Sequence, residues 1–133
     1  MMIRTATPND AVAMSHVLRE IMALTGRMRP HDPAFTLSNY ITAPDGIRCS
    51  VAVDDDGEVR GFQSLKRAVA GNRYDVPEGW GIIGTHISPR AHRRGVGRAL
   101  FAVSRDAAIA ARLARIDATI GADNSMGLTY YEA

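Results

Sequence analysis

Residues 88–101 read SPRAHRRGVGRALF and directly follow the run GIIGTHIS, residues 81–88. The run is largely apolar and β-branched, as in a central strand, and Pro89 ends it. After the glycines, apolar residues recur at spacings of three and four, which predicts a helix over residues 96–113: Val96, Leu100, Val103, Ala107 and Ala111. Residues 115–120, RIDATI, are the next strand candidate. Strand, glycine loop, helix and strand together predict a crossover unit.

The rest of the chain supplies the elements around this unit. Strands are predicted at residues 2–6, 47–53 and 58–68, and helices at residues 8–24 and 34–42. Asp54-Asp55-Asp56-Gly57 is a hairpin signal, so the two strands beside it should pair antiparallel. A buried stripe is expected on the first helix at Val12, His16, Leu18, Ile21 and Met22. Asn124 or Ser125 can cap a last helix that contains Tyr130 and Tyr131.

Composition predicts one globular domain over residues 1–133, with 46% hydrophobic and 23% charged residues. A net charge of only +2 argues against a non-specific nucleic-acid binder. The single cysteine, Cys49, excludes an internal disulfide, and no apolar run reaches the roughly 20 residues of a membrane span. The histidines are scattered without paired ligand spacing, so no metal site is expected. We expect a cytoplasmic protein.

The glycine loop is the strongest functional signal. The first turn of a helix has unpaired N–H groups, and Gly95 and Gly97 would let a phosphate approach them. Positive charge is expected around this point from Arg90, Arg93, Arg94 and Arg98. A P-loop is excluded, because no lysine follows the glycines. A dinucleotide fingerprint stays a weak rival, because Leu100 stands where a third glycine or alanine belongs.

Two motifs resemble the GCN5-related N-acetyltransferase (GNAT) superfamily. The segment His92-Arg93-Arg94-Gly95-Val96-Gly97 resembles its acetyl-CoA signature, although His92 stands where the family usually has Gln or Arg. The last twelve residues, ADNSMGLTYYEA, resemble a later motif of the family through Asn124, Gly127, Tyr130, Tyr131 and Glu132. The order of the predicted elements agrees with that fold.

The resemblance implies an α/β (α+β) fold, a mixed and mainly antiparallel twisted sheet flanked by helices. Family members usually continue with further strands after the Tyr-Glu motif, and the sequence ends at Ala133. With those C-terminal strands missing, we expect the RIDATI strand to be an exposed sheet edge. A homodimer through that edge or the last helix would cover it.

The resemblance also implies an N-acetyltransferase that transfers the acetyl group of acetyl-CoA to a primary amine by direct attack. The pyrophosphate would lie on the amides of residues 94–98, and the pantetheine would pair with the strand end. Cofactor-binding residues are then His86, Ile87, Ser88, His92, Arg93, Arg94, Gly95, Val96, Gly97, Arg98 and Asn124. A strand N–H near Ile87 would hold the oxyanion, and Tyr131 would be the general acid.

Three points stay open in the sequence. The general base could be His86, Glu78 or Asp75, the last two through water. The acceptor should lie over the first helix, the loop at residues 26–33 and the connection at residues 69–80, but its identity is not readable. The alternative function is a non-catalytic acetyl-CoA-binding or regulatory module of the same fold.

Overall fold

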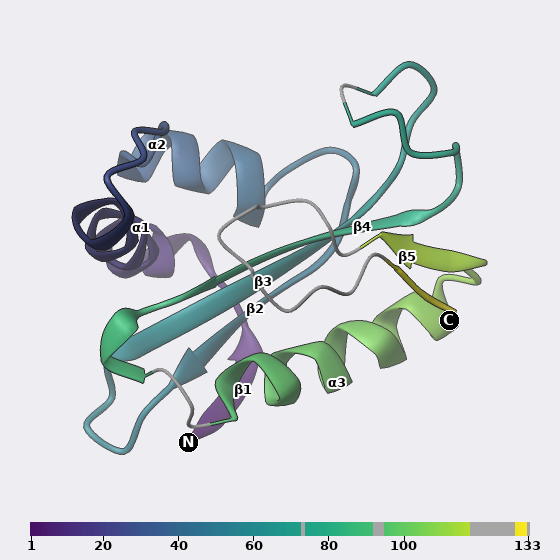
Figure 1. Ribbon diagram of the computed structural model, residues 1–133. Helices are drawn as coiled ribbons and strands as arrows, with labels where there is room; N and C mark the ends of the chain where they lie inside the picture. The colour runs from purple at the N-terminus through teal and green to yellow at the C-terminus, as the bar shows by residue number, and fades with distance from the viewer. Residues whose placement is uncertain (73, 92–94, 118–129, 133) are drawn as a thin grey trace.

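The computed structural model describes residues 1–72, 74–91, 95–117 and 130–132. Its described strands form one sheet in the order β1-β2-β3-β4-β5-β6. Figure 1 shows α1 and α2 on one side of this sheet and α3 on the other. The strands are β1 (Met2–Thr5), β2 (Gly46–Val53), β3 (Val59–Arg67), β4 (Gly81–Ile87), β5 (Arg115–Asp117) and β6 (Tyr130–Glu132). The longer helices are α1 (Ala11–Thr25) and α3 (Val96–Ala110).

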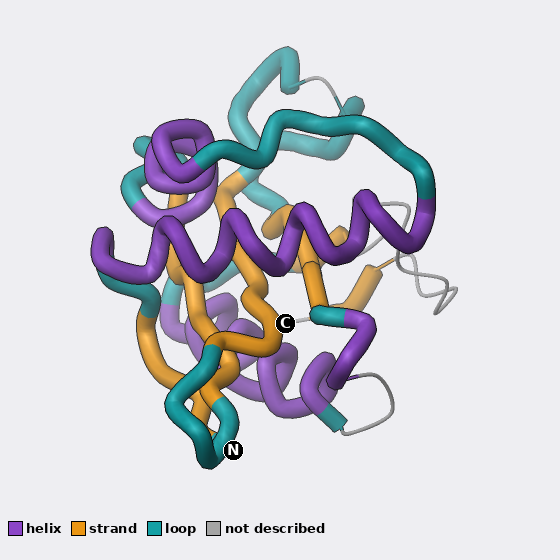
Figure 2. Tube along the Cα trace, turned by 90° about the vertical axis from the view of Figure 1, so that its left-hand side faces the viewer, coloured by secondary structure: helices purple, strands orange, loops and turns teal. Residues whose placement is uncertain are grey.

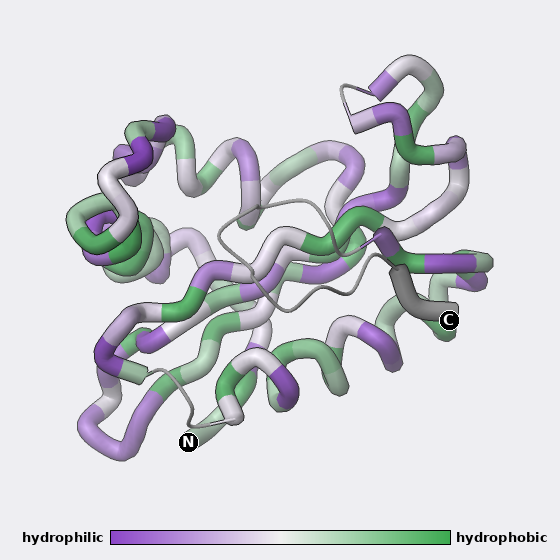
Figure 3. Tube along the Cα trace, in the orientation of Figure 1, coloured by the Kyte–Doolittle hydropathy of each residue, from purple (hydrophilic) through white to green (hydrophobic). Residues whose placement is uncertain are grey.

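The antiparallel part of the sheet was predicted correctly. β1 to β4 pair antiparallel in chain order, and Asp54 organises the turn between β2 and β3. Its carboxylate accepts from the N–H groups of Asp56 and Glu58 and from Nε of Arg60, the last at 2.6 Å. Figure 3 shows that the tip of this turn is hydrophilic. The hairpin signal in the sequence is therefore confirmed.

The first helix begins and ends on local signals. Asp10, in a short 3₁₀ turn (η1, Pro8–Asp10), accepts from the Thr7 N–H at 2.8 Å and from both terminal nitrogens of Arg4. Gly26 ends α1 with a left-handed φ of 75°. Figure 2 shows the following loop arching back to α2 (Pro33–Thr36), which continues as a π-helical turn, η2 (Leu37–Ile41).

Apolar residues fill both faces of the sheet. On the α1 face, helix residues pack with Tyr40, Cys49, Val51, Val53 and Phe62: Met14, Val17, Leu18 and Ile21. On the α3 face, Leu65, Ile83 and Ile116 form one cluster with the end of α3, and Ala52, Val96 and Leu100 form another at its start. The stripe predicted on α1 is thus only partly right, because Leu18 and Ile21 are buried but Val12 and His16 are exposed.

The crossover unit is confirmed. β5 pairs parallel with β4, at Ile116 opposite Gly81 and Asp117 opposite Ile82. α3 connects them and ends at Ala110, three residues before the predicted end. The reason is local, since Arg112 adopts a left-handed φ of 60° and Leu113 turns into the core at 4% exposure. Residues 118–120 of the predicted strand lie outside the described residues.

The prediction of a C-terminal helix is wrong for the last described residues. Tyr130–Glu132 form strand β6, antiparallel to β5, with Tyr131 opposite Ile116. Two consecutive tyrosines favour a strand, and the unpaired backbone groups of β5 offer a partner for it. The outer edge of β5 is consequently paired rather than exposed, and the reason for a dimer through that edge no longer applies.

Candidate functional site

The C-terminal half of β4 has an open edge. β4 pairs with β3 along its length, but with β5 only at its first two residues among those described. The Ser88 N–H donates to the carbonyl of Arg60 at 2.7 Å, which fixes the phase of the β3–β4 ladder. Backbone groups alternate between the two sides of a strand, so Thr85 and Ile87 direct theirs away from β3. Their N–H groups therefore face a slot that no described strand fills, here called the open edge of β4.

The first turn of α3 lies beside this open edge. A Cβ on Gly97 would be 3.3 Å from Cδ1 of Ile87, so the helix start contacts the last residue of β4. Gly95 precedes the helix with a left-handed φ of 74°, which glycine adopts without strain. No described side chain caps the helix, and the N–H groups of its first turn have no intrahelical partner. The arrangement can hold an anion next to the open edge.

The structure describes only some of the cationic residues that the sequence placed here. Arg98 is exposed on the first turn of α3. Arg90 instead donates from Nε to Glu20 on α1 at 2.9 Å, and its Nη2 lies 3.9 Å from Glu58. Arg90 thus joins α1 to the β2–β3 turn, contrary to our expectation. Three further residues lie outside the described residues: His92, Arg93 and Arg94.

The three strand residues expected beside the pantetheine differ in what they offer. The N–H of Ser88 is used by Arg60, and its buried Oγ accepts from the N–H of Arg90 at 3.2 Å. The register directs the backbone groups of His86 toward β3 as well. Of the three, Ile87 alone presents backbone groups to the open edge. Sequence reasoning missed this because it does not give the phase of the ladder.

The side chain of His86 lies on the α1 face, next to groups from three other elements. Nη1 of Arg29, in the loop after α1, is 3.3 Å from Nδ1 of His86. The rings of Tyr40 and Phe62 contact the imidazole, with centroids at 5.5 and 4.8 Å. Arg29 and His86 are 57 residues apart, and no sequence pattern indicated this contact.

The carboxylates considered as general bases lie at the other end of the strand. Asp75 and Glu78 are exposed in the connection that precedes Gly81. From Gly81 to Ile87 a strand extends about 20 Å at the usual rise per residue. Neither carboxylate is therefore close to the open edge of β4. The acidic residue of the loop at residues 26–33, Asp32, caps α2 by accepting from the Phe35 N–H at 2.7 Å.

The two expected site residues near the C-terminus are only partly described. Asn124 lies outside the described residues. The backbone of Tyr131 is in β6, opposite Ile116, which is itself opposite Gly81. Tyr131 is therefore level with the beginning of β4, the end that is far from Ile87, and β5 lies between the two strands.

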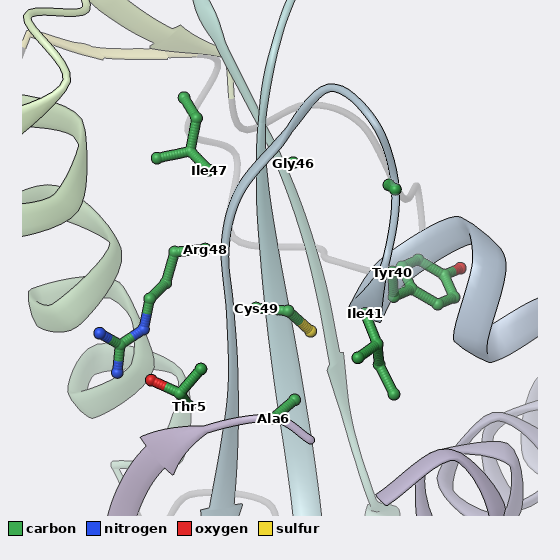
Figure 4. Close-up of a pocket in the computed structure, with 9 residues that line it drawn as sticks. Thr5, Ala6, Tyr40, Ile41, Gly46, Ile47, Arg48 and Cys49 are labelled. Carbon is green, nitrogen blue, oxygen red and sulfur yellow. The ribbon is translucent and has the colours of Figure 1, made fainter. Parts of the chain in front are cut away.

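Two cavities lie away from the open edge. One of about 160 Å³ opens where β2 continues beyond the end of β1, and Figure 4 shows Cys49 and Arg48 pointing to opposite sides of β2 there. Burial raises the pKa of the Cys49 thiol to about 12, so the thiol is a poor nucleophile. The other cavity, of about 290 Å³, lies near the start of β4 and includes Asp45, Lys66 and Tyr74.

The described residues show neither a metal site nor a membrane span. No three His, Cys, Asp or Glu side chains within this part of the chain are grouped so that they could hold a metal ion. Over the same residues, every helix is too short or too polar to cross a bilayer.

Comparison with solved structures places this geometry among acetyltransferases. A GCN5-related N-acetyltransferase from Kribbella flavida is 28% identical, with a TM-score of 0.66, over 86% of this chain and 68% of that one. A GNAT family acetyltransferase from Brucella melitensis, solved in complex with acetyl-CoA, is 19% identical with a TM-score of 0.66, over 95% of this chain and 80% of that one. At that identity the second likeness concerns the fold alone. Among curated proteins, no match was found.

The family comparison is more direct. The family model described as "Acetyltransferase (GNAT) family" matches residues 14–133, which is most of the chain. This match includes the glycine loop, the open edge of β4 and the C-terminal motif. The chain therefore belongs to the GNAT family of acetyltransferases.

Proposed function

We propose that the protein is an N-acetyltransferase that transfers the acetyl group of acetyl-CoA to a primary amine. One observation carries the proposal: the open edge of β4 lies against the uncapped start of α3. A strand edge whose N–H groups have no partner among the described residues suits an amide-bearing chain such as pantetheine, and a helix start suits its pyrophosphate. One similar structure supports this, since the GNAT family acetyltransferase from Brucella melitensis was solved in complex with acetyl-CoA.

Acetyl-CoA would be held by the residues of the glycine loop. Gly95, Val96, Gly97 and Arg98 offer first-turn N–H groups to the pyrophosphate. His92, Arg93, Arg94 and Asn124 stay predictions on the resemblance alone. Along β4, Ile87 and Thr85 offer backbone groups to the pantetheine. For His86 and Ser88 we now propose a supporting part, because their backbone groups are turned toward β3.

The chemistry is a direct attack. The neutral amine forms a C–N bond to the thioester carbonyl, the C–S bond breaks, and the thiolate takes up a proton. The N–H of Ile87 is aimed at the side where the carbonyl oxygen would lie, so it can stabilise the negative charge that develops there. No covalent enzyme intermediate is needed. Cys49, buried at 7% exposure, has no part in it.

Tyr131 remains our proposal for the general acid. A phenol has a pKa of about 10 and is protonated at neutral pH, as a proton donor must be. In the described register its backbone lies at the Gly81 end of β4. The role therefore requires that the C-terminal segment moves toward Ile87 when both substrates are bound.

Replacing Tyr131 with phenylalanine separates the two candidate functions. If Tyr131 is the acid, Tyr131→Phe lowers kcat by about 10²-fold or more and leaves acetyl-CoA affinity within twofold. Steady-state kinetics and calorimetry measure the two quantities. An unchanged kcat would remove Tyr131 from the mechanism. Absence of turnover in the wild type with a broad amine panel would favour the non-catalytic acetyl-CoA-binding module.

The direct test of the proposed function is a calorimetric titration with acetyl-CoA and, in parallel, with NADH. We expect micromolar binding of acetyl-CoA and none of NADH. Binding of NADH alone would reinstate the dinucleotide reading of the glycine loop. Binding of neither would contradict the proposal.

Cellular location and oligomeric state belong to the same proposal. We place the enzyme in the cytoplasm. A chain with a single cysteine forms no internal disulfide, which is compatible with a reducing compartment. A homodimer stays a prediction without its original reason, because β6 covers the edge of β5. Light scattering at micromolar concentration would decide between one and two copies.

A further inference from the structure

Side chains from distant parts of the chain surround the imidazole of His86. The residue is 3% exposed, and its ring packs against Tyr40 of η2 and Phe62 of β3, which also contact each other. The Phe62 ring is tilted by only 34° against the imidazole, whereas the Tyr40 ring is inclined at 65°. Arg29 approaches the remaining side with Nη1 at 3.3 Å from Nδ1. These contacts hold the ring in one orientation on the strand that carries the open edge.

The contact with Arg29 determines where the imidazole proton lies. A guanidinium has only donors, so Nδ1 of His86 must accept and the proton of the neutral ring must be on Nε2. Burial, together with the positive charge of Arg29, lowers the pKa of His86 to about 3. The other titratable side chain against the ring is Tyr40, which Lys66 of β3 approaches from 5.8 Å. At neutral pH His86 is therefore a hydrogen-bond donor and a poor proton acceptor.

Gly84 leaves space beside Nε2. Gly84 and His86 are two residues apart in β4 and point to the same face of the sheet. A Cβ on Gly84 would lie 3.7 Å from Nε2 of His86 and 3.3 Å from Oγ of Ser64, so a larger side chain at this position would crowd both groups. Gly84 is only half-buried, although its partner on β3, Ser64, and the preceding residue of β4, Ile83, are buried. Solvent thus reaches the sheet next to Nε2, one residue from the backbone of Thr85.

We propose that Arg29 and His86 form a positioning pair, in which Nε2–H of His86 donates to an oxygen of the acceptor and orients its amine toward the open edge of β4. The inference rests on the proposed acetyl transfer and adds the substrate class. The donor cannot bind the attacking nitrogen, because that lone pair forms the new bond. The acceptor must therefore carry an oxygen close to the amine, as an amino acid, its amide or a peptide N-terminus does.

The same arrangement excludes His86 as the group that takes the proton from the amine. His86 does not remove a proton from the amine, so the amine must bind in its neutral form. After attack, its surplus proton passes to water. His86 and Arg29 act on the position of the acceptor and take no part in bond breaking.

The first test compares two replacements of His86 with two acceptors. Glutamine can present an N–H near the position of Nε2, whereas leucine has no donor. Neither side chain can act as a base. Glycinamide carries the oxygen and ethylamine lacks it. We expect His86→Gln to keep kcat/KM for glycinamide within about threefold, and His86→Leu to lower it about tenfold, mainly through KM. For ethylamine both variants should stay within about threefold of wild type.

The outcomes separate a donor from a base. A loss of 100-fold or more in kcat with both variants and both amines would mean that His86 is the base, and would overturn the proposal. Equal losses of kcat/KM for the two amines in His86→Leu would contradict the proposed hydrogen bond from His86 to the oxygen of the acceptor. Thermal unfolding and acetyl-CoA titration of each variant show whether the fold and the co-substrate site are intact. Failure of acetyl-CoA binding in the wild type would instead contradict the proposed function.

A second test does not depend on turnover. Nitrogen NMR of the labelled chain reports the tautomer and charge of each imidazole. Between pH 8 and pH 5 we expect His86 to stay neutral with its proton on Nε2, and Arg29→Leu to abolish the fixed tautomer. A proton on Nδ1 of the wild type, or titration of His86 within that range, would overturn the proposal. His16, exposed on α1, is the internal reference.

Discussion

His86 shows how burial changes the use of one residue. In the sequence it is a histidine in an apolar strand, with an ordinary pKa of about 6.5. In the structure it is 3% exposed and accepts from a guanidinium, which together lower its pKa to about 3. The pKa of Asp10 is lowered as well, but there the Arg4 guanidinium stabilises the charged form of the carboxyl, whereas burial of His86 disfavours the charged form of the ring. The partner and the burial decide the direction in each case.

The His86 pKa predicts how stability depends on pH. Between about pH 6.5 and pH 3 the unfolded chain binds a proton at this histidine that the folded chain does not. The free energy of unfolding must therefore fall as the pH is lowered through that window. Urea titrations from pH 6.5 to pH 4.5 should show a shallower slope for His86→Gln than for the wild type. His16→Gln is the matched control; an unchanged slope in His86→Gln would contradict the prediction.

The helices α1 and α3 show which properties of a helix the spacing of apolar residues predicts. The periodicity gave the existence of α1 and α3 and the start of α3 at Val96. It was only partly right about the buried face of α1, because Leu18 and Ile21 are buried as predicted, but Met14 and Val17 take the place expected for Val12. It gave no indication that Gly97 would touch Ile87. Contact between elements is a property of their packing and has no local signal.

Gly97 gives a prediction at the level of the helix start. In Gly97→Val the new side chain would meet Cδ1 of Ile87 and cover the first-turn N–H groups. We expect acetyl-CoA affinity to fall at least tenfold, while the free energy of unfolding changes by about 1 kcal/mol or less. Calorimetry and urea unfolding measure the two. Ala102→Val, exposed on the same helix, should leave affinity unchanged; equal effects of both variants would contradict the role of Gly97.

In the whole molecule, one sheet separates two tasks. The α3 face and the adjoining open edge of β4 present the groups that suit acetyl-CoA. The α1 face holds Arg29 and His86, the groups that we assign to the acceptor. Ile87 is the last residue of β4 and contacts the start of α3, so both substrates would meet at one strand. A β4 fully paired with a fifth strand would have no such meeting point.

The sequence by itself determined the order and kind of most elements, the antiparallel hairpin, the crossover unit and the family. These follow from local patterns: alternation, helical spacing, turn residues and a glycine loop at a helix start. It was wrong for the C-terminal end, where a predicted helix is strand β6. A capping residue is a local signal, whereas β6 depends on the free edge of a distant strand.

Only the tertiary structure decided which groups face the site. It turned the backbone of Ile87 outward and those of His86 and Ser88 inward, and it moved Arg90 to Glu20. It also brought Arg29 to His86 across 57 residues. The physical reason is the same in each case. Ladder phase, burial and ion pairs depend on contacts between segments far apart in the chain, and a single sequence records the segments but not their contacts.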